Sequence, residues 1–252
     1  MQDNNGYLPK KAKLVASWNF TKKEENKNSL LLTGNIDYFN KGNFSGVNLD
    51  GCVACLSTSV PILNTSKSFS ITAWVKINSK LVNGTPILKE DEWARTAISQ
   101  NCTTHSVFYL GVRRIAETDN TTSIKWSFTI APIDGRETGK FDWCRANSST
   151  VVDEKFLDKW VFLVGVLDTE ERIVKLYVPS LNEIGIKSVP DGWDFWETNE
   201  GLQIGRSRWL ENDLDYWPGS IGPIRAYSGI LTDEEINKIY YTDLENYQPY
   251  IS

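Results

Sequence analysis

The sequence predicts an all-β protein, a two-sheet antiparallel sandwich with one short C-terminal helix. Apolar and polar residues alternate with a period of two along most of the chain, as they do in strands with one buried face. The chain has 252 residues, 40% of them hydrophobic and 23% charged, which is typical of a globular protein with a large core. Dipeptides typical of turns separate the alternating stretches: Asp50-Gly51, Asn83-Gly84, Asp134-Gly135 and Pro218-Gly219.

The first predicted strand is KLVASWNF, residues 13–20, where Leu14, Ala16, Trp18 and Phe20 share one face. The stretch IKWSFTI, which contains Trp126, has the same alternation with its apolar residues on one face. We expect these strands to bury one face in the core and to leave the other outside.

A further strand is predicted over FSITAWVKI, residues 69–77, whose apolar residues alternate from Phe69 to Ile77. Trp74 lies on the opposite face of this strand, where it is expected to line the concave surface of the sandwich. Large aromatic side chains on such a surface are candidates for ligand contacts.

The stretch WVFLVGVLD, residues 160–168, is apolar on both faces and therefore predicts a strand that is covered on both sides. The polar segment 168–171 predicts a hairpin turn that leads into the strand RIVKLYV, residues 172–178. Tryptophans in strand patterns, Trp160 among them, are expected to pack in the core.

The segment after Leu231 loses the period of two and predicts a helix from Thr232 to Tyr240. Thr232 and Glu235 have the spacing of a capping box, and Ile236, Ile239 and Tyr240 form one apolar stripe. The helix is expected to lie on the sandwich with this stripe inward. The chain shows no linker and no internal repeat, so a single domain is predicted over residues 1–252, with its core at about 12–241.

Composition narrows the range of partners. The net charge is −5 with a pI near 5.1, and the Lys and Arg residues form no long block, so nucleic acid is not an expected partner. The longest apolar stretch, 160–167, is far shorter than the roughly 20 residues that span a bilayer, so no transmembrane segment is predicted. The start MQDNNGYLPKK lacks the apolar region of a secretory signal.

The four cysteines allow at most two disulfides. Cys52 and Cys55 form a C-x-x-C pair, but zinc is not expected because a second pair is missing and His105 is the single histidine. Cys102 and Cys144 lie in polar segments beside strands expected to be neighbours, so a disulfide between them is predicted. His105 itself is interpreted as a surface-loop residue.

Three segments, in this order, resemble a known family: the laminin-G-like, concanavalin A-like jelly-roll domains of bacterial secreted proteins. The resemblance covers residues 12–241 and implies two curved antiparallel sheets with a short C-terminal helix. It also implies a secreted or cell-surface location. The segments include VNLDGCVACLSTSVPILNTSKSFSITAWVKI, KWVFLVGVLDTEERIVKLYV and LQIGRSRWLENDLDYWPGSIGPIRAYSGILTDEEINKIY.

One departure from the family concerns calcium. Many members carry the sequence Ile-Asp-Glu-Val-Arg near the end, and the resemblance associates its Asp with a structural calcium ion. Here Gly222 and Pro223 stand at the matching positions, and neither offers a carboxylate. A calcium site of that kind would need backbone carbonyls or other acids, and no other cofactor is predicted.

Tryptophans in polar, turn-rich segments are the best candidates for ligand contacts, because the apolar face of a sugar stacks on an indole while its hydroxyls bond to carboxylates. The alternative is a structural role, in which these rings cover the rims of the sandwich. The predicted ligand-binding residues are Trp93, Trp143, Trp209, Asp213, Asp215 and Trp217.

These features predict a non-catalytic, lectin-like module that binds carbohydrate or glycoprotein, as a monomer or as a domain of a larger secreted or surface protein. The alternative is a structural or protein-interaction jelly roll with no sugar ligand. An enzyme is not predicted, because a glycosidase needs two carboxylates about 5–9 Å apart. The acidic segments 90–92 and 168–171 lie in turns instead of on a concave strand.

Overall fold

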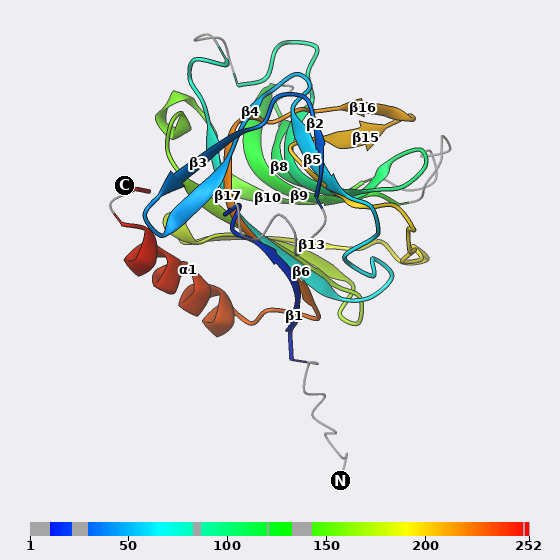
Figure 1. The fold of residues 1–252 in the computed structure, drawn as a ribbon. Helices are drawn as coiled ribbons and strands as arrows, with labels where there is room; N and C mark the ends of the chain where they lie inside the picture. The colour runs from blue at the N-terminus through cyan, green and yellow to red at the C-terminus, as the bar shows by residue number, and fades with distance from the viewer. Residues whose placement is uncertain are drawn as a thin grey trace.

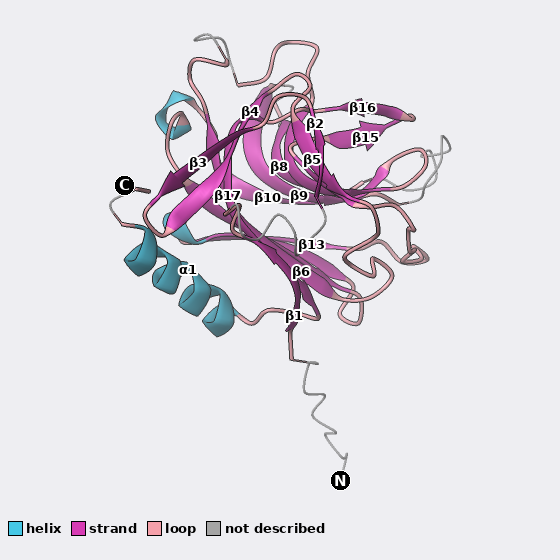
Figure 2. Ribbon diagram, in the orientation of Figure 1, coloured by secondary structure: helices cyan, strands magenta, loops and turns pink. Residues whose placement is uncertain are grey.

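The structure, a computed structural model, describes residues 11–21, 30–82, 87–119, 121–132, 143–248 and 250–251. The described chain forms two large antiparallel sheets that face each other, a separate hairpin and one α-helix on the outside (Figures 1 and 2). The two-sheet sandwich predicted from the sequence is therefore confirmed. The turns predicted at Asn83-Gly84 and Asp134-Gly135 lie outside the described residues.

The order of the strands across each sheet is as follows. The eight-stranded sheet runs β13 (Glu183–Ser188), β12 (Ile173–Val178), β11 (Val161–Asp168), β6 (Phe69–Ile77), β17 (Pro218–Ser228), β4 (Phe44–Asp50) and β3 (Asp37–Lys41), with β1 (Lys13–Trp18) also paired to β17. The seven-stranded sheet runs β10 (Cys144–Val151), β9 (Thr122–Ile130), β8 (Ser106–Ala116), β7 (Ala94–Asn101), β14 (Leu202–Ile204), β5 (Cys55–Thr58) and β2 (Leu30–Thr33). Strands β15 (Ser207–Trp209) and β16 (Asn212–Leu214) form the separate hairpin, and two short 3-10 turns cover Glu154–Phe156 and Pro179–Leu181.

The core lies between the two sheets and follows the alternation of the strands. Phe69 and every second residue of β6 to Ile77 point into it, as do Trp126 and Trp18. Strand β11 is buried along its whole length, because Leu163 faces this core and Phe162 faces a second cluster outside the sheet. The prediction of a strand covered on both sides is confirmed.

Helix α1 (Asp233–Tyr247) covers the outer face of the eight-stranded sheet (Figure 1). The capping box is present, since the Thr232 side chain accepts a bond from the Glu235 backbone N–H and the Glu235 carboxylate accepts one in return. The helix runs seven residues beyond the predicted end at Tyr240. The prediction stopped early because Asp243, a charged residue, interrupts the apolar stripe although it faces inward.

A buried ion pair fixes α1 to the sheet. The carboxylate of Asp243, 2% exposed, accepts bonds from the Arg225 guanidinium at 2.7 and 2.8 Å and from the Trp74 indole N–H at 2.8 Å. Trp74 therefore lies under the helix, where it packs on Phe162 and Tyr240. Its predicted place on an open concave surface is wrong, because helix α1 covers this part of the outer face of its sheet.

Smaller differences have local causes. Pro218 and Gly219 begin β17 and form no turn, whereas Gly51 does turn the chain with a φ of +75°.

Leu14 is half-exposed because a register shift interrupts β1 just after it. Trp160 packs edge-on against Phe44 at 4.8 Å on the helix side of the sheet, not between the sheets.

The predicted disulfide between Cys102 and Cys144 is not formed. Cys102 follows β7 and Cys144 begins β10, and two strands, β8 and β9, separate them in the sheet. Three strand spacings amount to about 14 Å, far beyond the roughly 7 Å limit for the Cα atoms of a disulfide. The thiol of Cys144 is buried, which raises its pKa to about 11.

Replacing Asp243 by Ala is expected to lower the free energy of unfolding by about 3–5 kcal/mol, because the Arg225 charge stays buried without its partner. Urea unfolding of the variant measures this. Replacing the exposed Glu245 of the same helix by Ala is the matched control and should change stability by less than about 0.5 kcal/mol. A loss below about 1 kcal/mol for the Asp243 variant would contradict the anchoring role.

Four free thiols are expected when the protein is unfolded in guanidinium without reductant and titrated with a thiol reagent. In the native protein at pH 8, the exposed Cys52 should react first and the buried Cys144 last, because the reagent attacks the thiolate. Finding only two thiols after unfolding would contradict this and would support the disulfide predicted from the sequence.

Candidate functional site

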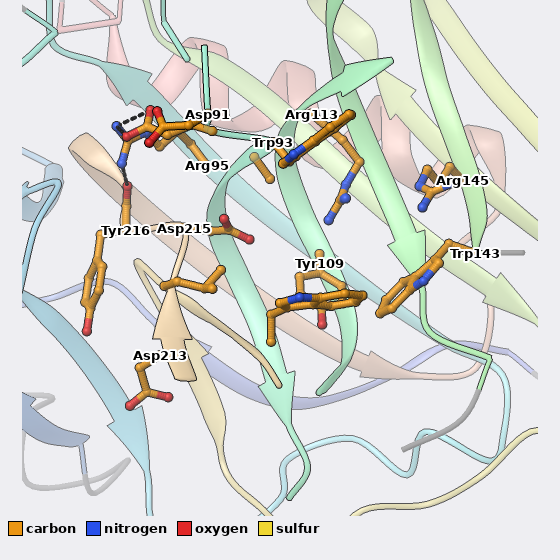
Figure 3. Close-up of a pocket in the computed structure, with 14 residues that line it drawn as sticks. Asp91, Trp93, Arg95, Tyr109, Arg113, Trp143, Arg145, Asp213, Asp215 and Tyr216 are labelled. Carbon is orange, nitrogen blue, oxygen red and sulfur yellow. Dashed lines mark hydrogen bonds and ion pairs between the residues drawn. The ribbon is translucent and has the colours of Figure 1, made fainter. Parts of the chain in front are cut away.

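A pocket of about 610 Å³ opens on the outer face of the seven-stranded sheet, away from the core. Strands β7, β8 and β10 supply its floor, and the β15–β16 hairpin supplies one wall (Figure 3). Strand alternation explains the floor: Phe108, Leu110 and Val112 of β8 point into the core, so Tyr109 and Arg113 point outward. We call this cavity the sheet-face pocket.

Three aromatic rings form a cluster in the sheet-face pocket. The Trp143 and Trp209 rings lie 5.2 Å apart at an angle of 47°, and Tyr109 contacts Trp143 edge-on at 5.6 Å. Behind them, the fully buried His105 stacks on Trp209 with ring centroids 4.5 Å apart. The prediction of His105 as a surface-loop residue is therefore wrong, and its role is to support the Trp209 ring.

The tip of the β15–β16 hairpin holds Trp209 in place. Leu210 and Glu211 form a two-residue turn with left-handed φ values of 48° and 67°, a conformation that favours glycine. The Leu210 N–H donates to His105 Nδ1 at 3.2 Å, and the Glu211 N–H donates to the Thr104 carbonyl at 2.9 Å. Strain that the surrounding structure maintains in this way is characteristic of binding sites.

Asp213 is a bridging residue of the hairpin wall. Its carboxylate pairs with Arg206 and, at 3.2 Å, with Nε of Arg208, the residue opposite it in the hairpin. These two guanidiniums occupy much of its acceptor capacity. Asp213 thus lines the pocket but serves first to fix the hairpin to the preceding turn.

Asp215 lies deeper in the pocket than Asp213, and hydrogen bonds hold both its backbone and its side chain. Its carbonyl accepts the Thr96 N–H at 2.8 Å, and its carboxylate accepts the Ser207 hydroxyl at 2.9 Å. Burial raises the pKa of this carboxyl above its ordinary value, and the nearby Arg113 charge opposes the rise. The residue also has a left-handed φ of 56°, which directs the chain from the hairpin back to the sheet.

Ion pairs and hydrogen bonds hold the loop before β7, which carries Trp93. The Glu92 carboxylate receives two bonds of 2.7 Å from Arg95, whose guanidinium also donates to the Tyr216 carbonyl at 3.2 Å. Arg114 donates its backbone N–H to the Trp93 carbonyl at 2.8 Å. The backbone of Trp93 is therefore fixed while its indole remains 61% exposed.

Five of the six predicted ligand-binding residues meet in this one pocket: Trp93, Trp143, Trp209, Asp213 and Asp215. The sixth, Trp217, does not. Its side chain is 0% exposed in the core between the sheets, and its indole N–H donates to the Lys76 carbonyl at 3.3 Å. Trp217 precedes β17 directly, and its side chain points inward, so it cannot act as a platform.

Sequence reasoning missed the residues of the sheet floor, Tyr109, Arg113 and Arg145. A signal was present, because the alternation in SVFYLGVRR places Tyr109 and Arg113 on the face opposite Phe108. Only knowledge of which face remains open could turn this alternation into a site, and that depends on where α1 lies.

The residues at the family's calcium position do not fit the ion. A Cβ on Gly222 would lie 2.9 Å from the Phe44 ring, so this part of β17 packs against an aromatic side chain. Among the described residues, no group of three or more His, Cys, Asp or Glu side chains is placed to hold a metal. Nor does any described helix have the length and apolar character needed to cross a membrane.

The sequence matches the family model of the concanavalin A-like lectin/glucanases superfamily over residues 53–237. No curated protein matches the sequence closely enough to count as a relative.

Solved structures share the fold at low sequence identity. Domain 4 of an extracellular arabinanase from Geobacillus stearothermophilus, in complex with arabinotriose, is 15% identical with a TM-score of 0.56, over 91% of this chain and 99% of that domain. A carbohydrate-binding module of the evolved Dit protein of Lactobacillus casei BL23 phage J-1 is 10% identical with a TM-score of 0.50, over 89% and 99% of the two chains. Both likenesses concern the fold alone.

Replacing Trp217 by Ala is expected to lower the free energy of unfolding by about 3–5 kcal/mol, because a large buried ring leaves a cavity. Replacing the exposed Trp93 by Ala should cost less than about 1 kcal/mol. Chemical unfolding of both variants tests this contrast. Equal losses for the two would show that one of these side chains is misplaced.

Proposed function

The chain belongs to the concanavalin A-like lectin/glucanases superfamily, and we propose that it is a non-catalytic carbohydrate-binding module whose ligand occupies the sheet-face pocket. The observation that carries this proposal is the aromatic cluster of Trp143 and Trp209, with the exposed indole of Trp93 at the same pocket. A sugar ring has an apolar face that covers an indole and hydroxyls that need polar partners at its edge. The pocket offers both.

The energetics favour weak, reversible binding. Covering apolar surface contributes roughly 25 cal/mol per Å², and a single sugar unit covers only part of two rings. The Asp215 carboxylate supplies an acceptor for hydroxyls, and each such bond has a net contribution of about 0.5–3 kcal/mol. Binding that holds a polymer therefore requires several contacts or several modules.

Two solved structures with the same fold support this assignment, because one holds a bound oligosaccharide and the other is a carbohydrate-binding module. The arabinanase domain is complexed with arabinotriose and belongs to an extracellular enzyme, and the phage module is a carbohydrate-binding module. By analogy we propose that this chain, as a single domain, works outside the cell as part of a larger secreted or surface protein. In such a protein a binding module brings a partner domain to its glycan.

The carboxylates of the pocket favour binding over hydrolysis. Glu92 is neutralised by Arg95, and Asp213 is shared between Arg206 and Arg208, so both acids have structural partners. Acid–base cleavage of a glycosidic bond needs two carboxyl groups with distinct protonation states that flank the bond. Burial raises the pKa of the Asp215 carboxyl, and its bond from the Ser207 hydroxyl fits a hydrogen-bonding role.

A glycan array followed by calorimetry tests the proposed function. Replacing Trp209 or Trp143 by Ala is expected to weaken binding of any array hit at least about tenfold, because each removes part of the stacking surface. Replacing Tyr241 by Ala, which is 60% exposed on the distant helix α1, should leave affinity unchanged. No hit at millimolar ligand would favour a structural jelly roll without a sugar ligand.

A further inference from the structure

Arg113 stands out among the arginines around the sheet-face pocket because its donors are not used. Among the described residues its guanidinium makes no hydrogen bond and no ion pair, and it lies over the Tyr109 ring at 5.6 Å. By contrast, Arg95 is bound to Glu92. The guanidiniums of Arg206 and Arg208 are likewise bound to Asp213.

A guanidinium without hydrogen bonds on the floor of a pocket can donate its N–H groups to a ligand. Strand β8 lies inside the sheet between β7 and β9, so the backbone of Arg113 is fixed on both sides. The Tyr109 hydroxyl donates to the Arg208 carbonyl at 2.8 Å, which fixes the ring on which the guanidinium rests. The planar guanidinium also loses less entropy for each hydrogen bond that it forms than a lysine ammonium does.

The charges of Asp215 and Arg113 interact, but the two side chains form no ion pair among the described residues. In Figure 3, Asp215 lies on the Tyr216 side of the pocket, and Arg113 lies between Asp215 and Arg145. The Asp215 carboxyl is bound to Ser207 instead. The positive charge of Arg113 thus faces the space above the aromatic cluster.

Arg145 adds a second positive charge at the same end, with its guanidinium 6.0 Å from the Trp143 ring centre. The aromatic cluster is therefore bordered by two arginines, although the chain as a whole has a net charge of −5. A planar guanidinium matches a carboxylate through two parallel hydrogen bonds, a match that a neutral hydroxyl cannot offer.

Resting on the proposed function, we infer that the preferred ligand is an acidic sugar, a hexuronic acid unit whose carboxylate binds Arg113 while its ring lies on Trp143 and Trp209. Arg113 then determines specificity, and the tryptophans supply affinity for sugars in general. A neutral sugar of the same shape would stack equally well but leave the guanidinium without a charged partner.

The test compares oligomers of glucuronic and galacturonic acid with the same oligomers after reduction of their carboxyl groups to neutral hexoses. By calorimetry at 50 mM salt, the acidic form is expected to bind about tenfold more tightly than its reduced form. Raising the salt to 500 mM should shrink this difference, because the charges are partly exposed.

Replacing Arg113 by Gln should remove the preference for the acidic oligomer and leave the affinity for the reduced one within about twofold. Arg113→Lys, which keeps the charge without the fork, should restore part of the preference. Lys175→Gln, which removes one charge on the other sheet, is the matched control and should change neither. Thermal melting of each variant confirms folding.

The outcomes separate the two proposals. Equal affinity for acidic and reduced oligomers, or equal weakening of both by Arg113→Gln, would overturn the inference and leave the proposed function standing. Absence of binding by every oligomer and every array glycan would overturn both.

Discussion

Helix α1 covers the outer face of the eight-stranded sheet over Trp74 and leaves the outer face of the other sheet open. Both sheets of the sandwich have an inner face in the core, and each needs its outer face either covered or polar. The buried pair of Asp243 and Arg225, with the Trp74 indole as a third partner, attaches α1 to the outside of the eight-stranded sheet. The outer face of the seven-stranded sheet stays open, and there the strand alternation places Tyr109 and Arg113.

The open face becomes a pocket because two loops rise beside it and are held by polar contacts. On one side the Glu92–Arg95 pair fixes the segment that carries Trp93. On the other, a hairpin with two left-handed residues at its tip places Trp209 against buried His105. Each contact orders the backbone beside an indole that lines the pocket, so the pocket is preorganised and little ordering is needed when a ring stacks there.

The period of two and the capping box were enough to predict the sandwich, the doubly covered strand β11 and the start of α1. The same alternation could not tell which outer face remains open, because that depends on Asp243, a charged residue that no hydrophobic pattern marks as inward. For this reason Trp74 was predicted to be on an open surface and Arg113 was missed. Trp217 was misplaced because a tryptophan beside Pro-Gly looks like a loop residue, although it directly precedes a strand and packs in the core.

The central claim is that a sugar stacks on the aromatic cluster of the seven-stranded sheet, and the ten indole N–H signals of the protein give a direct measurement of it. In an NMR titration with an acidic oligosaccharide, the signals of Trp143 and Trp209 should shift progressively. The signals of the buried Trp74 and Trp126 should stay in place. Shifts confined to Trp160, on the other sheet, or no shifts at all at saturating sugar, would contradict the account.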